Sequence, residues 1–321
     1  MDDRFTLILD GVGGARLAED GSAANVETGG FVWVHVMQAG RGEADWLTAL
    51  GGDEAVCAAL LAEETRPRCT LLGSAVLLNM RGVNLAPGAQ PEDMVSIRIW
   101  ARADLVVTVT RRPVLALDDL YDRCVDGAAP TSPAEMIARL ALRLADRAEP
   151  VVAELNERID DLEEQLAGTG ALPQRSALAD IRRVSIVLRR YMFPQRDALS
   201  TLEIEDVAWI GGLERARLRE ATERVTRLAE ELDAIRDRAQ VVHDHIMDSR
   251  AEAMNRQMLV LSVVTAIFLP LGLLTGLLGI NVGGIPGADS LSAFWIVAAG
   301  LCVLGVAQLT LFWRMGWLGR R

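Results

Sequence analysis

The stretch MLVLSVVTAIFLPLGLLTGLLGI occupies residues 258–280 and contains no charged residue. As a helix rising 1.5 Å per residue it would extend about 35 Å, which is enough to cross a hydrocarbon core of about 30 Å. Gly279 and Ile280 close the stretch and Asn281 follows directly. We therefore expect a transmembrane helix here, with the side-chain carbonyl of Asn281 at a membrane face, where it can meet a hydrated cation.

A second apolar stretch, FWIVAAGLCVLGVAQLTLFW, covers residues 294–313. The loop between the stretches, residues 282–293, carries one charge, Asp289. Arginines instead flank the outer ends of the pair: Arg250, Arg256, Arg314, Arg320 and Arg321. Because positive charges stay on the cytoplasmic side, both chain ends are predicted to be cytoplasmic and the loop to lie outside. The N-terminus shows no signal-peptide pattern, so we expect the N-terminal domain to stay in the cytoplasm. The two spans predict a multi-pass protein of the cytoplasmic membrane.

One face of the first predicted span collects its small and weakly polar side chains. Two helices cannot enclose a pore, so conduction would require several copies of the chain. The residues that recur at helical spacing on this face are Asn255, Met258, Ser262, Thr265, Leu269, Gly272 and Gly276. Small residues also serve helix packing in membranes. Pore lining and helix packing therefore both remain open from the pattern alone.

A long helical region precedes the first span. Residues 204–258 contain no proline, and their only glycines are Gly211 and Gly212. Continued through Ile280, this would be one helix of about 75 residues, or about 115 Å. Two further helices are predicted before it. One covers Pro133–Leu166 with Ser132 and Glu135 as its cap, and the other covers Gln174–Tyr191 before Pro194.

Acidic residues continue the polar face of the first span toward the cytoplasm. Asp244, Asp248 and Glu252 share a helix face with Asn255. Their oxygens could concentrate cations at a pore entrance, although a simply solvated helix face would show the same pattern. His243, His245 and Asp289 are further candidate metal ligands. His243 and His245 point in different directions on a helix, so one chain alone is not expected to supply a tight site.

Residues 1–130 alternate strand and helix patterns, which predicts an α+β domain of α/β/α type with a mixed sheet. The expected strands are Phe5–Leu9, Phe31–Val36, Cys69–Asn79, Val95–Ala101 and Leu105–Thr110, and the expected helix is Ala44–Ala62. The last two strands are predicted to form a hairpin. Gly11–Gly14 is interpreted as a turn, and His35 as a packed residue rather than a ligand.

Composition excludes several functional classes. The net charge is −11 and all 33 basic residues are Arg, which argues against a nucleic-acid partner. The four Cys are widely spaced and form no C-x-x-C motif. No catalytic constellation is visible, so we expect neither an enzyme nor a cofactor. Any metal ion would be cargo.

Several motifs identify a family resemblance. They are Met254-Asn255-Arg256-Gln257-Met258, Phe268-Leu269-Pro270-Leu271, Gly279-Ile280-Asn281 and Gly283-Gly284-Ile285-Pro286-Gly287. Supporting stretches cover residues 64–68, 81–85, 91–95 and 194–199. With these motifs the chain resembles the CorA family of divalent-cation channels and transporters, and within it the ZntB group of zinc transporters.

The resemblance implies a homopentameric funnel in a bacterial inner membrane. A cytoplasmic domain (1–130) would lead through a helical stalk (131–257) into the pore helix (258–280). The loop (282–293), the second span (294–313) and a cytoplasmic tail (314–321) would follow. Asn281 would then ring the periplasmic mouth, and Asn255 and Met258 would lie at the cytoplasmic entrance.

The expected transported ion depends on one difference from the CorA pattern, within Gly279-Ile280-Asn281, and on the resemblance to the ZntB group. Ile280 stands where the CorA pattern has Met. This departure argues against Mg²⁺ selectivity of the CorA type, and the ZntB resemblance implies Zn²⁺ transport with proton coupling. A Mg²⁺, Co²⁺ or Ni²⁺ channel remains the alternative within transport. A non-conducting, membrane-anchored scaffold or sensor remains the alternative from another class.

Overall fold

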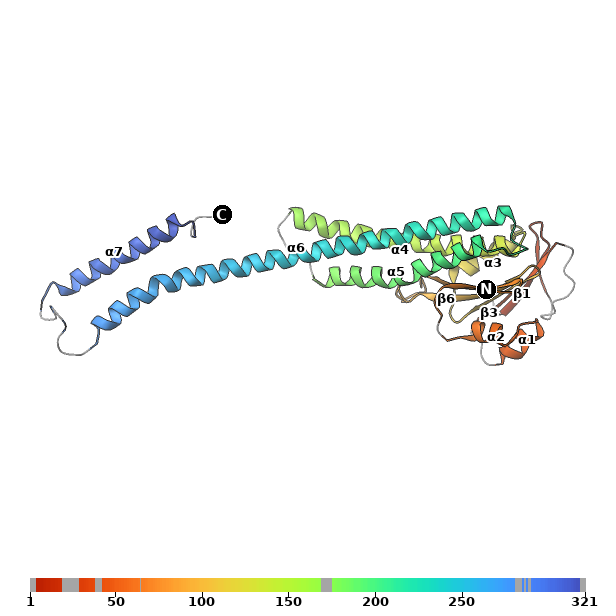
Figure 1. Cartoon of the computed structure of the whole chain (residues 1–321), viewed down its shortest axis with the longest axis horizontal. Coiled ribbons are helices and arrows are strands. Elements are labelled where there is room, and N and C mark those ends of the chain that lie inside the picture. Colours follow the sequence, from red (N-terminus) through yellow and green to blue (C-terminus); the bar gives the residue numbers. More distant parts are fainter. Residues whose placement is uncertain are drawn as a thin grey trace. The chain divides into compact units, whose positions relative to one another are not determined.

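The computed structural model describes residues 4–18, 29–37, 42–63, 65–168, 175–280, 285, 287 and 290–317. The chain divides into two compact units, Met1–Val242 and His243–Arg321. One uninterrupted helix, α6 (Gly212–Leu278), contributes to both units (Figure 1). The second unit also contains α7 (Ala293–Arg314).

A seven-stranded mixed sheet forms the centre of the first unit. Its strands are β1 (Arg4–Leu9), β2 (Ala15–Leu17), β3 (Phe31–Met37), β4 (Arg68–Leu72), β5 (Ala75–Gly82), β6 (Val95–Arg102) and β7 (Leu105–Thr110). They are ordered β2-β1-β3-β7-β6-β5-β4. Among the described strands, only β3 and β7 pair in parallel, and β6 and β7 form the predicted hairpin. The mixed sheet expected from the sequence is therefore confirmed.

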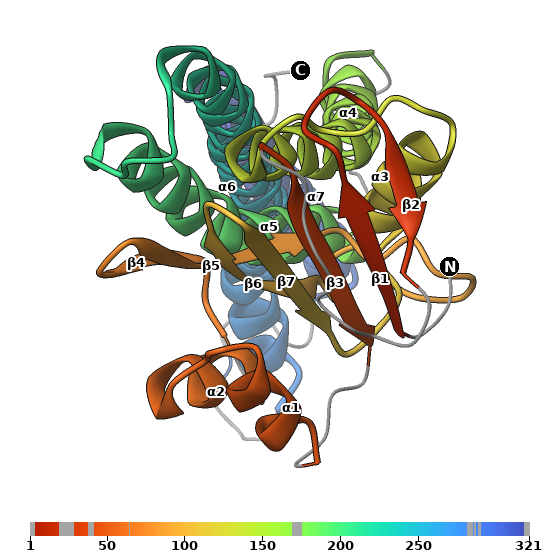
Figure 2. The same ribbon diagram turned by 90° about the vertical axis from the view of Figure 1, so that its right-hand side faces the viewer.

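Helices cover both faces of this sheet (Figure 2). On one face lie α1 (Glu43–Ala49) and α2 (Glu54–Leu61), and on the other lie α3 (Leu115–Val125), α4 (Pro133–Gly168) and α5 (Arg175–Ile204). Because both faces are covered, β3 and β7 are buried almost throughout. His35 on β3 is fully buried, and its Nδ1 lies 2.9 Å from Thr108 Oγ1 on the paired strand. This confirms that His35 is a packed residue.

Glycine divides two elements that the sequence pattern had joined. The single helix expected over Ala44–Ala62 is two helices. Gly51 has φ +86°, and Asp53 caps α2 by accepting a 2.8 Å hydrogen bond from Val56 N–H. The single strand expected over Cys69–Asn79 is the β4–β5 hairpin, which turns at Gly73 with φ +60°. Glycine adopts these backbone conformations without steric cost.

Proline, in contrast, does not end α5. The helix expected over Gln174–Tyr191 continues through Pro194 to Ile204. Side chains on both sides of Pro194 are buried, including Leu188, Met192, Leu199 and Leu202. Gln195 is also buried, and its Oε1 accepts a 2.7 Å hydrogen bond from Arg81 N–H. Tertiary packing thus offsets the backbone hydrogen bond that proline removes.

The long helix begins later than the pattern predicted. Ile204 belongs to α5, and α6 starts at Gly212. The intervening segment is held in place by its own contacts. Trp209 Nε1 donates to Ser74 O at 2.8 Å, and Val207 and Ile210 are buried. Gly211 and Gly212 therefore mark the start of the helix rather than an interior position.

Ser132 caps the start of α4 as expected, but the Glu135 side chain bonds to Thr131 and not to Ser132. Ser132 Oγ accepts a hydrogen bond from Glu135 N–H at 3.2 Å. The Glu135 side chain reaches Thr131, accepting hydrogen bonds from its N–H at 2.8 Å and from its hydroxyl at 2.5 Å. Arg139 and Arg217 also pair with this carboxylate. Burial alone would raise the pKa of Glu135, but these hydrogen bonds and the charge of Arg139 outweigh it and hold the pKa below its usual range.

Candidate functional site

The second unit contains the two helices that are long and apolar enough to cross a membrane. They are the C-terminal part of α6 and the whole of α7. Many large apolar side chains on them are exposed in the single chain, among them Leu261, Phe268, Leu273, Trp295 and Trp313. Such a surface requires lipid or other copies of the chain to cover it.

The polar stripe predicted from the sequence lies along one face of α6. Asn255, Met258, Ser262, Thr265 and Leu269 all fall within this continuous helix, as do Gly272 and Gly276. Each of these side chains is exposed in the single chain. The helix accommodates Thr265 by letting its hydroxyl donate to Leu261 O at 2.8 Å. The helix also passes through Pro270 without ending.

The face of α6 that contacts α7 lies on the other side of the helix from Thr265. Val263 is buried, and Ile267 and Leu271 are partly buried. A Cβ added at Gly305 of α7 would lie 3.9 Å from Leu271 Cδ1. At 3.6 residues per turn, positions 263, 267 and 271 face away from 265 and 269. In this unit α7 therefore leaves the polar stripe uncovered.

The signature residues follow the end of α6. Gly279 N–H donates to Thr275 O at 2.9 Å and to Gly276 O at 3.2 Å, which closes the last turn. A Cβ at Gly279 would lie only 3.0 Å from Thr275 O, so a residue without a side chain fits this close turn. Ile280 is exposed. Asn281 and Asp289 lie outside the described residues, as does most of the loop between the spans.

The predicted cation approach also lies on α6. Asp244, Asp248 and Glu252 are exposed and share a helix face, and His243 and His245 stand on the same stretch of helix. Among the residues that the structure describes, no three His, Cys, Asp or Glu side chains of one chain converge as a metal site. Any site built on these residues would therefore need ligands from more than one copy of the chain.

One polar residue of the second span was not singled out from the sequence. Gln308 lies within α7 and is partly buried, and its Oε1 has no hydrogen-bond partner in the described part of the chain. An amide inside an apolar span is costly without a partner. The sequence could have indicated this residue, because Gln308 is an isolated Gln within the apolar segment 294–313.

Comparison with known proteins places these features in a family. The model of the CorA-like Mg²⁺ transporter protein family matches residues 28–314. The chain is 40% identical to the divalent cation transporter CmaX of Pseudomonas aeruginosa, over 98% of this chain and 96% of that protein. It is 36% identical to the zinc transport protein ZntB of Pectobacterium atrosepticum, over 93% of this chain and 91% of that protein.

A solved structure of full-length CmaX has the same architecture. It matches with a TM-score of 0.84 at 36% identity, covering 99% of this chain and 99% of that chain. The similarity therefore extends over the mixed sheet, the long helix and both candidate spans. From the family model and these full-length relatives, the chain belongs to the CorA family of divalent-cation transporters, a family of transporters and not of enzymes.

Proposed function

We propose that this protein transports Zn²⁺ across a bacterial inner membrane along a path lined by the α6 helices of several copies. The observation that carries the proposal is the uncovered polar stripe. α7 packs on the opposite side of α6, while Ser262, Thr265 and their neighbours on the stripe remain exposed. The Thr265 hydroxyl already donates to Leu261 O. Lipid would, however, leave the Ser262 hydroxyl and the Asn255 amide poorly solvated, whereas a water-containing path between copies would hydrate them.

The assembly that we propose is a homopentamer with both chain ends in the cytoplasm. The exposed apolar side chains of both spans support assembly or lipid contact over most of their surface. Arginine flanks the cytoplasmic ends of the spans in the sequence. The number five comes from the family resemblance, and light scattering of the purified protein can measure it.

At the two ends of the path we assign different roles to the polar residues. Asn281 would form a ring of amide oxygens that contacts the hydration shell of the entering ion. Asp244, Asp248 and Glu252 would raise the local cation concentration at the cytoplasmic end. Repeated around a central axis, these three positions would supply many carboxylates, although a single chain holds no convergent metal site among its described residues.

Zn²⁺ is our choice of cargo for two reasons. Ile280 replaces the Met of the CorA signature, and relatives named as zinc transport proteins match nearly the whole chain. Mg²⁺ holds its water more tightly and prefers oxygen ligands, so an amide ring alone would also accept it. Residues 258–280 contain no titratable side chain. Proton coupling would therefore involve His243, His245, Asp289 or the cytoplasmic carboxylates.

Flux into proteoliposomes that contain a metal-sensitive dye tests this function. Zn²⁺, Mg²⁺ and Co²⁺ are compared with and without a pH gradient, and we expect Zn²⁺ entry to be fastest and to respond to the gradient. Equal entry of Mg²⁺ and Zn²⁺ would contradict the zinc assignment. The absence of any metal entry from a protein of unchanged oligomeric state would favour the scaffold or sensor alternative.

Asn281→Ala tests the role assigned to the mouth. We expect this variant to lose most of its metal entry while it keeps the oligomeric state of the unmodified protein. Val264→Leu is the matched control, because Val264 lies on α6 between the polar stripe and the face that contacts α7. Unchanged flux in Asn281→Ala would remove Asn281 from the proposed path.

A further inference from the structure

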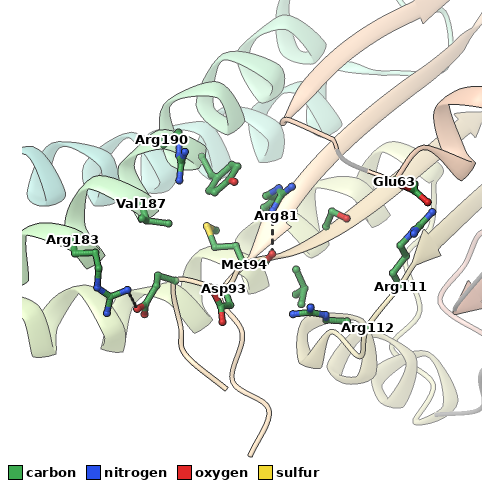
Figure 3. A pocket seen from close by; sticks show the side chains of 13 residues that line it. Glu63, Arg81, Asp93, Met94, Arg111, Arg112, Arg183, Val187 and Arg190 are labelled. Atoms are coloured by element: carbon green, nitrogen blue, oxygen red, sulfur yellow. Dashed lines mark hydrogen bonds and ion pairs between the residues drawn. The ribbon is translucent and has the colours of Figure 1, made fainter. Parts of the chain in front are cut away.

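A cavity of about 580 Å³ opens in the first unit, between one end of the sheet and α5. Strands β5 and β6, the segment before β6, the residues after β7, and one face of α5 contribute to it (Figure 3). Its lining is Glu63, Arg81, Glu92, Asp93, Met94, Val95, Ser96, Arg111, Arg112, Arg183, Val187, Arg190 and Tyr191. These residues are spread over the sequence and lie far from the transport stripe in the chain.

Positive charge predominates in the described lining, which holds five guanidinium groups and three carboxylates. Arg183 and Glu92 neutralise each other through a 2.5 Å ion pair. In the described part of the chain, Arg112 has no hydrogen-bond or ion-pair partner. Arg190 has only a contact at 5.4 Å with the ring of Tyr191. Two guanidinium groups are therefore available to a ligand.

Arg81 is held in a fixed position at the wall of the cavity. Its Nε and Nη2 donate to Thr65 O at 3.1 and 2.7 Å. Its Nη1 donates to Met94 O at 3.1 Å (Figure 3). Its guanidinium also stacks over the Tyr191 ring at 4.2 Å. All of these partners are neutral groups. They orient the guanidinium but do not neutralise its positive charge.

A further arginine lies behind the same wall. Arg98 is fully buried and donates from Nη2 to Ala62 O at 2.7 Å and to Glu63 O at 3.2 Å. Its Nε and Nη1 have no hydrogen-bond partner among the described residues. Burial, together with the charges of Arg111 and Arg81, lowers the pKa of Arg98 to about 10. Like charges are thus concentrated where burial makes their repulsion strong.

We propose that this cavity binds a soluble anion that carries phosphate groups. Guanidinium groups donate paired hydrogen bonds to phosphate oxygens, and an anion here would offset the repulsion among the arginines. The cavity volume lies within the usual range for small-molecule sites. Among the described residues that line it, only Met94, Val95 and Val187 are aliphatic, which is too little apolar surface to hold the acyl chains of a phospholipid.

The test is calorimetric titration of the full-length protein in detergent with inorganic pyrophosphate at low ionic strength. The test variant is the double substitution Arg112→Gln with Arg190→Gln, because these exposed side chains have no described hydrogen-bond or ion-pair partner whose loss would disturb the fold. The matched control is Arg123→Gln, which removes an exposed arginine from α3, away from the cavity. A separate titration uses vesicles of phosphatidylglycerol.

We expect the unmodified protein and Arg123→Gln to bind pyrophosphate alike, and the double variant to bind at least about tenfold more weakly. Binding should also weaken as salt is added. No binding by the unmodified protein would overturn the proposal, and would favour a cavity filled by a neighbouring copy. The proposal would also be overturned if all three proteins bound pyrophosphate equally. It would be overturned as well if the unmodified protein bound the vesicles but did not bind pyrophosphate. Because no step requires metal flux, failure here would leave the transport proposal standing.

Discussion

His35 shows how one buried side chain links this fold to pH. It is fully buried between Phe5 and Thr108, and its Nε2 has no hydrogen-bond partner in the described part of the chain. Burial lowers the pKa of His35 to about 4. The folded protein therefore keeps this ring neutral at pH values where an unfolded chain, with an ordinary pKa near 6.5, would protonate it.

This difference predicts a loss of stability in mild acid. As the pH falls from 6.5 toward 4, the unfolded state binds a proton that the folded state does not, so the free energy of unfolding decreases. Between pH 7 and pH 5 the expected decrease from His35 is about 2 kcal/mol. Urea unfolding of the full-length protein in detergent measures it. His35→Gln should flatten this dependence and the exposed His245→Gln should keep it, whereas the same slope in both variants would contradict the assignment.

Gly11 illustrates a residue that the fold requires for space and for backbone conformation. It has φ +78°, and a Cβ added there would lie 2.3 Å from Gly29 O. Gly73 also has positive φ, at +60°, but open space surrounds it.

Gly11→Ala should therefore cost about 2 to 4 kcal/mol of unfolding free energy, and Gly73→Ala about 1 kcal/mol. Thermal and urea unfolding of the two variants test the difference. Equal losses of unfolding free energy in the two variants would show that the close approach of Gly11 to Gly29 does not affect stability.

At the scale of elements, α4 and α6 are joined by a one-sided set of ion pairs. Every arginine in the set is on α6 and every carboxylate is on α4. The pairs are Arg217–Glu135, Arg224–Asp146, Arg227–Glu149, Arg238–Asp160 and Arg238–Glu163. Partner numbers rise together along both helices, so the two helices run parallel. Apolar side chains on both helices are also buried, among them Leu155 and Ile159 of α4 and Leu228 and Ile235 of α6.

Arg238 makes the largest number of these contacts. Hydrogen bonds to Glu163 and Asp160 raise its pKa above the ordinary value, and Nη1 also donates to Asn156 at 2.9 Å. Arg238→Gln should lower the free energy of unfolding by about 1 kcal/mol at low salt and by much less at about 1 M salt.

Arg227→Gln is the matched control on the same helix, because the ion pair between Arg227 and Glu149 is long, at 3.5 Å. It should change the unfolding free energy by less than about 0.5 kcal/mol. A salt-independent loss in Arg238→Gln would point to packing of its aliphatic chain instead of charge pairing.

Hydrophobic periodicity correctly predicted the elements whose apolar residues face the protein core or the membrane as the pattern requires. The strands β1, β3, β6 and β7, the helix α4 and both apolar spans lie close to their predicted positions. The predictions were wrong where a single residue decides whether an element ends. Gly51 and Gly73 divide elements through conformations that hydrophobicity does not encode. Pro194 fails to end α5 because distant residues bury both of its flanks.

At the scale of the molecule, the sequence predicted the polar stripe but not the arginine-lined cavity. The stripe follows from spacing along one helix, so periodicity reveals it. The cavity brings together Arg81 of β5, Arg112 of the segment after β7 and Arg190 of α5, and no local pattern connects them. The side of α6 that contacts α7 was also beyond prediction, because it depends on how two apolar helices pack.

Cysteine accessibility during transport tests whether the stripe on α6 lines a cation path between copies. Thr265→Cys and Val264→Cys are made in a Cys302→Ser background, and Zn²⁺ entry into proteoliposomes is measured before and after a positively charged methanethiosulfonate reagent is added. These neighbouring positions differ by about 100° around the helix. We expect the reagent to block Zn²⁺ entry through the Thr265→Cys variant and to leave entry through Val264→Cys unchanged. Equal inhibition of both variants, or inhibition of Val264→Cys alone, would contradict it.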